Sequence, residues 1–278
     1  MVLVAGTGIA AVELAAGFLG NSLVLLSDGA HYVADLVAVA LAIGAVSWSA
    51  RPADPAHSFG HQRAEVLACF ANGLLLGVLT VLFAVEAVAR LLAPVPVNGL
   101  LLVAVGAFTF GANFALAILM RRGDPEDLNQ RAVYLHILSD GVGSVGAVVA
   151  GLLVVSLGWT WADPAATLFV VALMTLFTVR LLRPSLHILM EGTPEGIEPE
   201  EVASTLRGLP SVQDIHDLHV WTLAPGTVSV SVHVVVLGTP TDDRVVHEAQ
   251  TALRRRYRIL HATIQIEAAD CPCAGARH

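Results

Sequence analysis

The sequence predicts an α-helical membrane protein with six transmembrane helices, followed by a small cytosolic domain with the element order αββαβ. Hydrophobic residues make up 55% of the 278-residue chain and charged residues only 14%. The mean hydropathy is +0.72, which is typical of a chain that spans a membrane. Near residue 190 the composition becomes polar, which indicates that a soluble domain follows. The net charge of -8 argues against nucleic acid as a partner.

Six apolar segments are each near or above the roughly 20 helical residues that cross about 30 Å of hydrocarbon. The segments cover residues 2–19, 22–48, 64–91, 97–120, 132–157 and 164–182. A cleaved signal peptide is the alternative for the first segment, but no basic residue precedes it and Glu13 interrupts it. We therefore expect a first membrane helix with a shortened cytosolic tail before it.

Arginine residues decide the predicted orientation in the membrane. They flank the connections after the second, fourth and sixth segments, whereas the connections after the first, third and fifth hold almost none. Because basic loops stay on the cytoplasmic side, both termini are predicted to be cytoplasmic in a multi-pass inner-membrane protein. The arginines behind this prediction are Arg51, Arg63, Arg121, Arg122, Arg131, Arg180 and Arg183.

The polar C-terminal region predicts a small open sheet that is covered on one face by helices. Helices are expected over residues 200–208 and 242–257, and strands over 212–223, 227–237 and 261–267. We expect a transmembrane domain over residues 1–189, a cytosolic domain over residues 190–270 and a mobile tail over residues 271–278. A tight turn after the first strand places Leu218 opposite His233, with His216 as the diagonal neighbour of His233.

Two of the apolar segments contain a histidine and an aspartate one helical turn apart. His31 and Asp35 lie in HYVAD, and His136 and Asp140 lie in HILSD. Residues at i and i+4 share one face of a helix, so each segment presents its pair together. An ionisable group at the bilayer centre costs about 2.5–3.5 kcal/mol, so such groups need a partner or a function. Together the two pairs supply four ligands of the kind that tetrahedral zinc prefers.

The alternative for each pair is a structural role, in which its side chains bond to a neighbouring helix. The recurrence of the same pair on a second segment favours a metal site. Zinc needs neutral imidazole and ionised carboxylate, so its binding releases protons and protonation releases the metal. Asp28, one turn before His31, either tunes this site or bonds locally near the helix start. Asn72 and Asn113 are expected to donate hydrogen bonds between helices rather than to bind metal.

Two further groups of side chains outside the apolar segments each allow two interpretations. Asp54, His57 and His61 follow the second segment, and either surround one metal or belong to a solvated polar loop. His216 and His233 of the predicted hairpin either form a metal site or are ordinary surface histidines.

The C-terminal end of the chain contains two more candidate features. Cys271 and Cys273 are either soft metal ligands or members of a disordered tail. The arginine-rich run at residues 254–258 either ends a solvated helix or touches the anionic headgroups of membrane lipid.

These motifs together resemble those of one known family. HYVAD and HILSD on the second and fifth of six apolar segments, with HSFGHQRAE and HDLHVWTL, resemble the cation diffusion facilitators, specifically the bacterial zinc, cadmium and cobalt exporters. The resemblance covers essentially the whole chain. It implies a homodimer that exports divalent cations from the cytoplasm in exchange for protons, with Zn²⁺ as the main ion and Cd²⁺ or Co²⁺ as others. It also implies a cytosolic domain like that of metallochaperones.

The resemblance also implies which residues bind metal. It assigns the transport site to His31, Asp35, His136 and Asp140, the loop site to Asp54, His57 and His61, and a binuclear site at the dimer interface to His216, His233 and His247. On the last predicted strand, Glu267 stands where some relatives have histidine. The family's N-terminal extension is expected to be absent here, and with it any His-rich metal-gathering tail.

We therefore expect a zinc/proton antiporter that is not an enzyme. The alternative is a membrane zinc sensor whose soluble domain signals occupancy without transport. Ligands at mid-membrane favour transport, because a sensor needs no site in hydrocarbon. An intramembrane metalloprotease is a further alternative, but the HExxH motif is absent.

Overall fold

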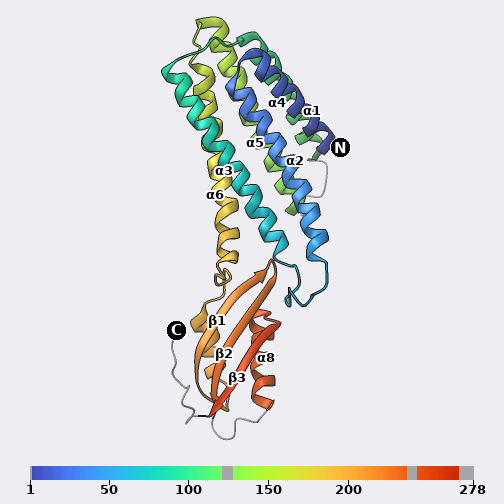
Figure 1. The fold of residues 1–278 in the computed structure, drawn as a ribbon, viewed down its shortest axis with the longest axis vertical. Helices are drawn as coiled ribbons and strands as arrows, with labels where there is room; N and C mark the ends of the chain where they lie inside the picture. Colours follow the sequence, from blue (N-terminus) through green and yellow to red (C-terminus); the bar gives the residue numbers. More distant parts are fainter. Residues whose placement is uncertain (1, 121–127, 237–242, 269–278) are drawn as a thin grey trace. The chain divides into compact units, whose positions relative to one another are not determined.

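The computed structural model describes residues 2–120, 128–236 and 243–268. Within these residues the N-terminal region forms six helices (Figure 1). Their bounds are α1 Val2–Gly20, α2 Leu23–Ser49, α3 Ala64–Leu92, α4 Gly99–Met120, α5 Leu128–Leu157 and α6 Ala162–Leu189. Among the described residues, five of these helices are long and apolar enough to cross a membrane, and α1 is a shorter apolar helix. The predicted set of six apolar helices is confirmed.

The sixth helix extends beyond its predicted end at residue 182. The helix continues through Pro184 and ends at Leu189. Proline removes one intrahelical hydrogen bond, but the turns on either side of it keep theirs. The apolar run therefore stops before the helix does, and the predicted end was wrong by about two turns.

The chain divides into two compact units. The first comprises Met1–Gly44 and Cys69–Leu182, and the second comprises Ala45–Ala68 and Arg183–His278. The second unit thus includes one end each of α2, α3 and α6. The domain boundary at residue 189 rests on composition and stays a prediction. The tail 271–278, with Cys271 and Cys273, lies outside the described residues.

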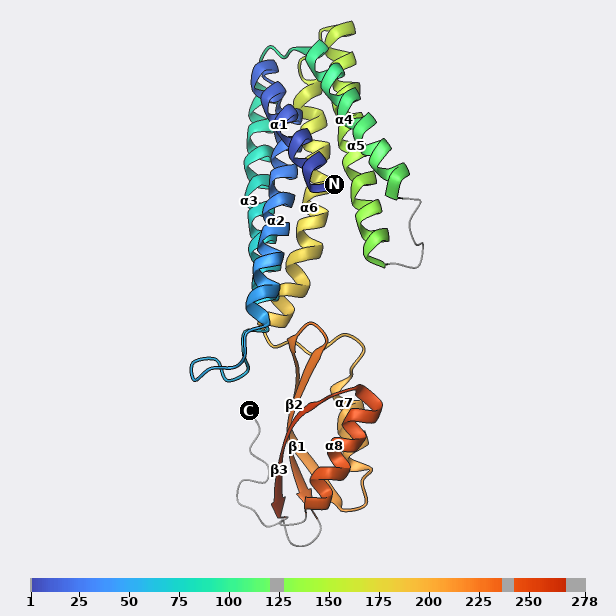
Figure 2. The ribbon, with the colours of Figure 1, turned by 90° about the vertical axis from the view of Figure 1, so that its right-hand side faces the viewer.

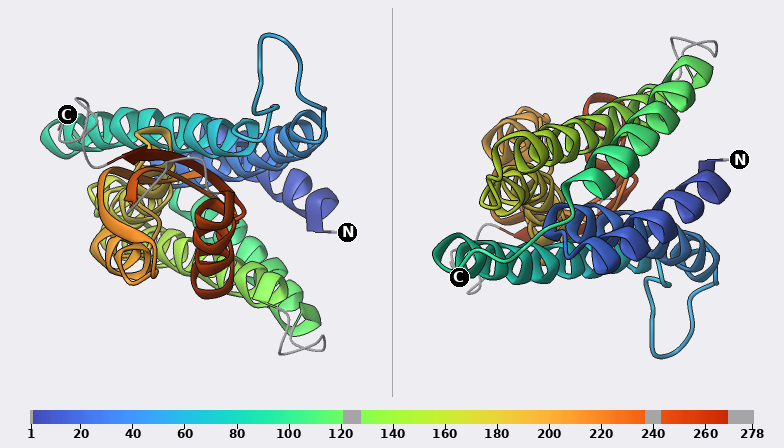
Figure 3. Two further views of the ribbon diagram at one scale, coloured as in Figure 1. Left: turned by 90° about the horizontal axis from the view of Figure 1, so that it is seen from below. Right: turned by 90° about the horizontal axis from the view of Figure 1, so that it is seen from above.

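Two helices of the first unit, α4 and α5, run side by side (Figure 3). Glycine permits their close approach, because a Cβ atom on Gly151 would lie 2.8 Å from the carbonyl oxygen of Gly99. A Cβ atom on Gly106 would lie 3.1 Å from the backbone nitrogen of Val148. A larger residue at either position would push the two helices apart. This contact fixes the position of α5, which carries two of the candidate ligands.

A side chain of α6 caps the N-terminus of α2. Asp163 is fully buried and accepts hydrogen bonds from the Ser22 hydroxyl at 2.6 Å and from the backbone amides of Leu23 and Val24 at 2.8 and 3.3 Å. The first N–H groups of a helix have no intrahelical partner, and a carboxylate there also compensates the helix dipole. Asp163 therefore fixes the start of the helix that carries His31 further along.

The second unit contains a three-stranded sheet with helices on one face (Figure 2). Its elements are α7 Pro199–Arg207, β1 Val212–Ala224, β2 Thr227–Val236, α8 Asp243–Tyr257 and β3 His261–Ala268. The central strand β2 pairs antiparallel with β1 and parallel with β3. Val230, Val232 and Val234 of β2 share a core with Leu206 of α7 and Leu253 of α8. The predicted αββαβ order, with one open sheet face, is confirmed.

The register of the β1–β2 hairpin differs from the prediction. His216 lies directly opposite His233, instead of diagonal to it. The cause is a register shift between His216 and His219, where Asp217 has a φ of 51°. Such a bulge adds a residue to one strand and changes the pairing beyond it. Aspartate tolerates this left-handed conformation, but a single aspartate is too common to predict it.

We predict that Asp163→Ala lowers the stability of the protein. Three buried donors would lose their acceptor, which costs about 2 kcal/mol or more. Thermal unfolding of the detergent-solubilised protein measures the effect. The control is Glu86→Gln on α3, whose exposed side chain pairs with Arg90 four residues on, and which should change stability by less than about 1 kcal/mol. Equal unfolding temperatures for the two variants would contradict a capping role for Asp163.

Candidate metal sites

Helices α2 and α5 bring the four predicted membrane ligands together. His31 Nε2 lies 3.7 Å from Asp35 Oδ2 and 3.8 Å from Asp140 Oδ1. His136 Nε2 lies 3.0 Å from Asp35 Oδ2 and 3.8 Å from Asp140 Oδ2. The centroids of the two imidazole rings are 5.9 Å apart. Each imidazole nitrogen therefore faces both carboxylates, and we call these four residues the membrane quartet.

Three members of the membrane quartet are spaced like the ligands of one metal ion: a ligand atom of each of His31, Asp35 and His136 lies within 4.8 Å of the others, and Asp140 is outside that group. With bonds of about 2.0 Å to zinc, the donor atoms of a tetrahedral site are about 3.3 Å apart. The nitrogen–oxygen distances of the quartet range from 3.0 to 3.8 Å and include that value. Asp140 is buried at 7% exposure, so an ionised carboxylate there needs a compensating positive charge.

Hydrogen bonds between helices support the membrane quartet. Asn113 of α4 donates a bond of 2.7 Å to the hydroxyl of Tyr32, the residue after His31. The hydroxyls of Thr109 on α4 and Ser144 on α5 are 3.2 Å apart and hydrogen-bonded. The prediction that Asn113 donates a hydrogen bond between helices is confirmed. These contacts hold α2, α4 and α5 against one another at the level of the ligands.

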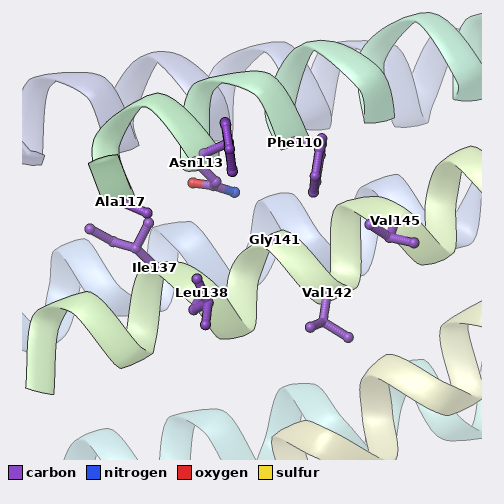
Figure 4. Close-up of a pocket in the computed structure, with 9 residues that line it drawn as sticks. Phe110, Asn113, Ala117, Ile137, Leu138, Gly141, Val142 and Val145 are labelled. Atoms are coloured by element: carbon purple, nitrogen blue, oxygen red, sulfur yellow. The ribbon is translucent and has the colours of Figure 1, made fainter. Parts of the chain in front are cut away.

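An apolar pocket of about 270 Å³ lies between α4 and α5 (Figure 4). Asn113 is the polar exception among its lining side chains. The others are Phe110, Phe114, Ala117, Ile137, Leu138, Gly141, Val142 and Val145. The pocket offers no additional metal ligand, so it does not extend the quartet. Asn72, on α3, has a buried Oδ1 without a hydrogen-bond partner among the described residues, and its role stays a prediction.

The connection between α2 and α3 gathers the second predicted set of ligands. Asp54 Oδ1 accepts hydrogen bonds from the backbone amides of Ala56 and His57 at 2.8 and 2.7 Å, and lies 3.1 Å from His57 Nδ1. His61 Nε2 is 3.6 Å from Asp54 Oδ2. Desolvation raises the pKa of Asp54, but the hydrogen bonds from His57 and Ala56 outweigh it and hold this pKa below its usual value. The carboxylate is therefore ionised and available to a cation.

The open face of the sheet gathers a third set. His216 Nε2 lies 3.0 Å from Glu267 Oε2, and His233 Nδ1 lies 3.0 Å from Glu267 Oε1. Glu267 is buried, and Gln265 donates a hydrogen bond of 2.7 Å to its Oε1. Desolvation raises the pKa of Glu267, but the hydrogen bonds from His216 and Gln265 prevail and leave this pKa below its usual value. Two imidazoles and a carboxylate suit zinc with one position left open.

Neither His247 nor Asp217 belongs to this third set of described residues. His247 is exposed on α8 and belongs to none of the three groups of described residues that could hold a metal ion. Asp217 was not predicted as a metal ligand, yet its Oδ2 lies 3.7 Å from His233 Nε2 and its Oδ1 lies 2.9 Å from His219 Nε2. The position of Asp217 between His216 and His219 in HDLH could have marked it as a partner of histidine. The direction of its side chain depends on the bulge, which the sequence did not predict.

Two carboxyl groups of the first unit that are not members of the membrane quartet are also buried. Glu13 of α1 is 0% exposed and Asp28 of α2 is 3% exposed. The sequence treated Glu13 only as an interruption of an apolar run. A charge in the middle of such a run was the available signal.

Two family models together match most of the chain. Residues 1–190 match the model described as the cation efflux transmembrane domain, and residues 194–269 match the one described as the cation efflux protein, cytoplasmic domain. The "Cadmium, cobalt and zinc/H(+)-K(+) antiporter" of Bacillus subtilis is 36% identical over 269 residues, which cover 94% of this chain and 85% of that protein.

Further similar proteins carry names from the same group. The zinc transporter ZitB of Escherichia coli is 38% identical over 266 residues, which cover 95% of this chain and 85% of that protein. The metal cation efflux system protein CzcD of Cupriavidus metallidurans is 34% identical, with coverage of 95% and 84%. A solved structure of the metal-bound C-terminal domain of the CzcD transporter is 36% identical, with a TM-score of 0.24. The match covers 26% of the present chain and 99% of the chain in that solved structure.

We predict that Glu267→Gln weakens zinc binding to the third set, His216, His233 and Glu267, at least about 10-fold. The amide keeps the shape of the side chain but removes the negative charge between the two imidazoles. Competition with a chromophoric chelator, at a fixed neutral pH, measures the affinities of the full-length protein. Glu248→Gln, at an exposed position on α8, is the matched control and should bind zinc like the wild type. Unchanged affinities in Glu267→Gln would remove Glu267 from the ligand set.

Proposed function

The chain belongs to the cation efflux family, and from that membership we propose that it exports divalent metal cations, zinc foremost, from the cytoplasm in exchange for protons. Cadmium and cobalt are further candidate ions, because they appear in the names of similar proteins. The proposed location is the inner membrane, with both termini cytoplasmic, as the distribution of arginines favours.

One observation carries this proposal: four ligand side chains from two apolar helices face one another at 3.0–3.8 Å. Two imidazoles and two carboxylates are borderline ligands that suit zinc better than magnesium or calcium, which prefer oxygen alone. A site of this kind in hydrocarbon is useful to a protein that moves the ion across. Rocking of helices around such a site would expose it to one side of the membrane and then to the other.

Proton exchange follows from the charges of the membrane quartet. Without a cation, the carboxylates of Asp35 and Asp140 bring two uncompensated negative charges into an apolar region. A divalent metal compensates both charges, and two protons do the same. Since metal and protons bind the same atoms, the arrival of one favours release of the other. We therefore propose that protons are the counter-ion of the exported metal.

The loop set of Asp54, His57 and His61 and the cytosolic set of His216, His233 and Glu267 are proposed as further zinc sites. We also propose that the protein is a homodimer. The family model of the cytoplasmic domain, which residues 194–269 match, has a short name that refers to a dimer. In such a dimer His247, which is exposed on α8, is available to ligate metal across the interface. The open position of the cytosolic set would accept a ligand of this kind.

The second candidate function is a membrane zinc sensor without transport. The cytosolic set supports this candidate, because a soluble metal site is enough to report zinc concentration. The membrane quartet argues against it, because ligands within apolar helices add nothing to sensing and cost insertion energy. Reconstituted vesicles distinguish the two functions: zinc uptake driven by a pH gradient is expected for the antiporter, and its complete absence would leave only the sensor.

We predict that Asp35→Ala and Asp140→Ala each abolish zinc flux into such vesicles while the protein remains folded and dimeric. Each variant removes one of the two carboxylates that compensate the metal charge. Size-exclusion chromatography checks the oligomeric state. Glu86→Gln serves as the control and should transport at the wild-type rate. Wild-type flux in either aspartate variant would refute the quartet as the transport site.

We predict that His31→Asp shifts ion preference toward harder cations such as manganese. A carboxylate in place of imidazole makes three of the four ligands oxygen donors, which hard cations favour. The readout is the ratio of manganese to zinc flux in the same vesicle preparation. His261→Asp, at an exposed position of β3, is the substitution-matched control and should keep the wild-type ratio. An unchanged ratio in His31→Asp would show that His31 does not set selectivity.

A further inference from the structure

Glu13 and Asp28 are two acidic side chains that the membrane quartet does not use. Glu13 lies in the middle of α1 and is 0% exposed, and Asp28 lies near the start of α2 and is 3% exposed. The two carboxyl groups interact with each other. Their helices are in close contact at this level, because a Cβ atom on Gly29 would lie 2.9 Å from Leu14 Cγ. We call Glu13 and Asp28 the carboxyl pair.

The carboxyl pair lacks the partners that buried carboxylates normally have. Both Oε atoms of Glu13, and Oδ2 of Asp28, are buried without a hydrogen-bond partner among the described residues. The nearby Thr109 hydroxyl is engaged with the carbonyl of Gly106 and with Ser144. Asp163 shows the contrast, since that buried carboxylate accepts three hydrogen bonds. The carboxyl pair is therefore not a helix cap of the same kind.

Helices α1, α2 and α4 contain no lysine or arginine that could compensate the carboxyl pair. Glu13 is the one charged residue of α1, and α4 contributes the uncharged Thr109 and Asn113. The titratable groups that interact with the carboxyl pair belong to α2 and α5, and they are Tyr32, Asp35 and Asp140. Asp35 and Asp140 are the carboxylates of the quartet, whose charges the exported metal compensates.

Two ionised carboxylates side by side in an apolar region are strongly unfavourable, and neighbouring carboxyl groups relieve this by holding a proton. The electrostatic interactions of the carboxyl pair link it to the quartet: Glu13 interacts with Asp140, and Asp28 interacts with both Asp35 and Asp140. Without metal, the two quartet aspartates add negative potential and favour protonation of the pair. With a divalent cation bound, both negative charges are compensated and that potential is removed.

We propose that the carboxyl pair is a proton-binding site separate from the metal ligands, which holds a proton while the quartet lacks metal and releases it when metal binds. The step is a simple acid dissociation, in which a carboxylic acid becomes a carboxylate and a proton as the divalent cation arrives. The proposal rests on the proposed proton-coupled export, and adds a site where one of the exchanged protons resides. The metal ligands then need not carry every proton that crosses.

Infrared difference spectroscopy of the full-length protein in liposomes, with and without zinc, tests this proposal directly. A protonated carboxyl group gives a carbonyl-stretch band that shifts in D₂O. Zinc should remove this band in the wild type, and the component due to the carboxyl pair should be missing in Glu13→Gln and in Asp28→Asn. Glu13→Asp keeps an ionisable group and should keep a shifted band. Glu86→Gln, on the exposed face of α3, should behave as the wild type.

Calorimetry in buffers of different ionisation enthalpy adds a second readout, the number of protons released per zinc bound. Glu13→Gln should release about one proton fewer than the wild type, and because that release is coupled to binding, its zinc affinity at fixed neutral pH should fall by about 10-fold or more. The proposal would be overturned if Glu13→Gln and Asp28→Asn both released as many protons per zinc as the wild type and both kept its carbonyl-stretch band. Failure of the antiport itself would look different: vesicles that contain the wild-type protein would move zinc without any proton flux. That result would be seen before any variant is made.

Discussion

The physical constraint behind this structure is the high energy of negative charge in an apolar environment. Two helices that cross the hydrocarbon carry aspartates, and each aspartate faces two imidazole nitrogens instead of a fixed cation. A fixed cation, such as a lysine, would neutralise the site permanently. Histidine leaves the charge open to a mobile cation or to protons. In the proposed function, the need for compensation is the basis of exchange between the two kinds of cation.

The remainder of the membrane unit holds these side chains in position. The buried cap from Asp163 fixes where α2 begins, and the contact of Gly99 with Gly151 brings α4 and α5 together. The hydrogen bond from Asn113 to Tyr32 joins α4 to α2 at the level of the ligands. A metal site needs donor atoms positioned to within a few tenths of an ångström. Contacts between helices, rather than the ligands alone, supply that precision.

The sequence predicted what depends on local periodicity and composition, and it failed where tertiary packing decides. The i, i+4 spacing of His31 and Asp35 was enough to place both on one helix face. The bulge at Asp217 was not predictable, because a single residue with positive φ leaves no composition signal. The continuation of α6 past Pro184 depends on the turns beyond it. Burial of Glu13 was invisible because one acidic residue in an apolar run shows neither its depth nor its neighbours.

The central claim is that the membrane quartet binds the exported ion with two imidazoles and two carboxylates. X-ray absorption spectroscopy of zinc bound to the full-length protein tests it most directly when the loop and cytosolic ligands His57, His61, His216 and His233 are replaced by alanine. We predict one tightly bound zinc with four nitrogen and oxygen neighbours at about 2.0 Å, two of them with the scattering pattern of imidazole. A six-coordinate zinc surrounded by water, or the loss of all tight binding, would contradict the claim.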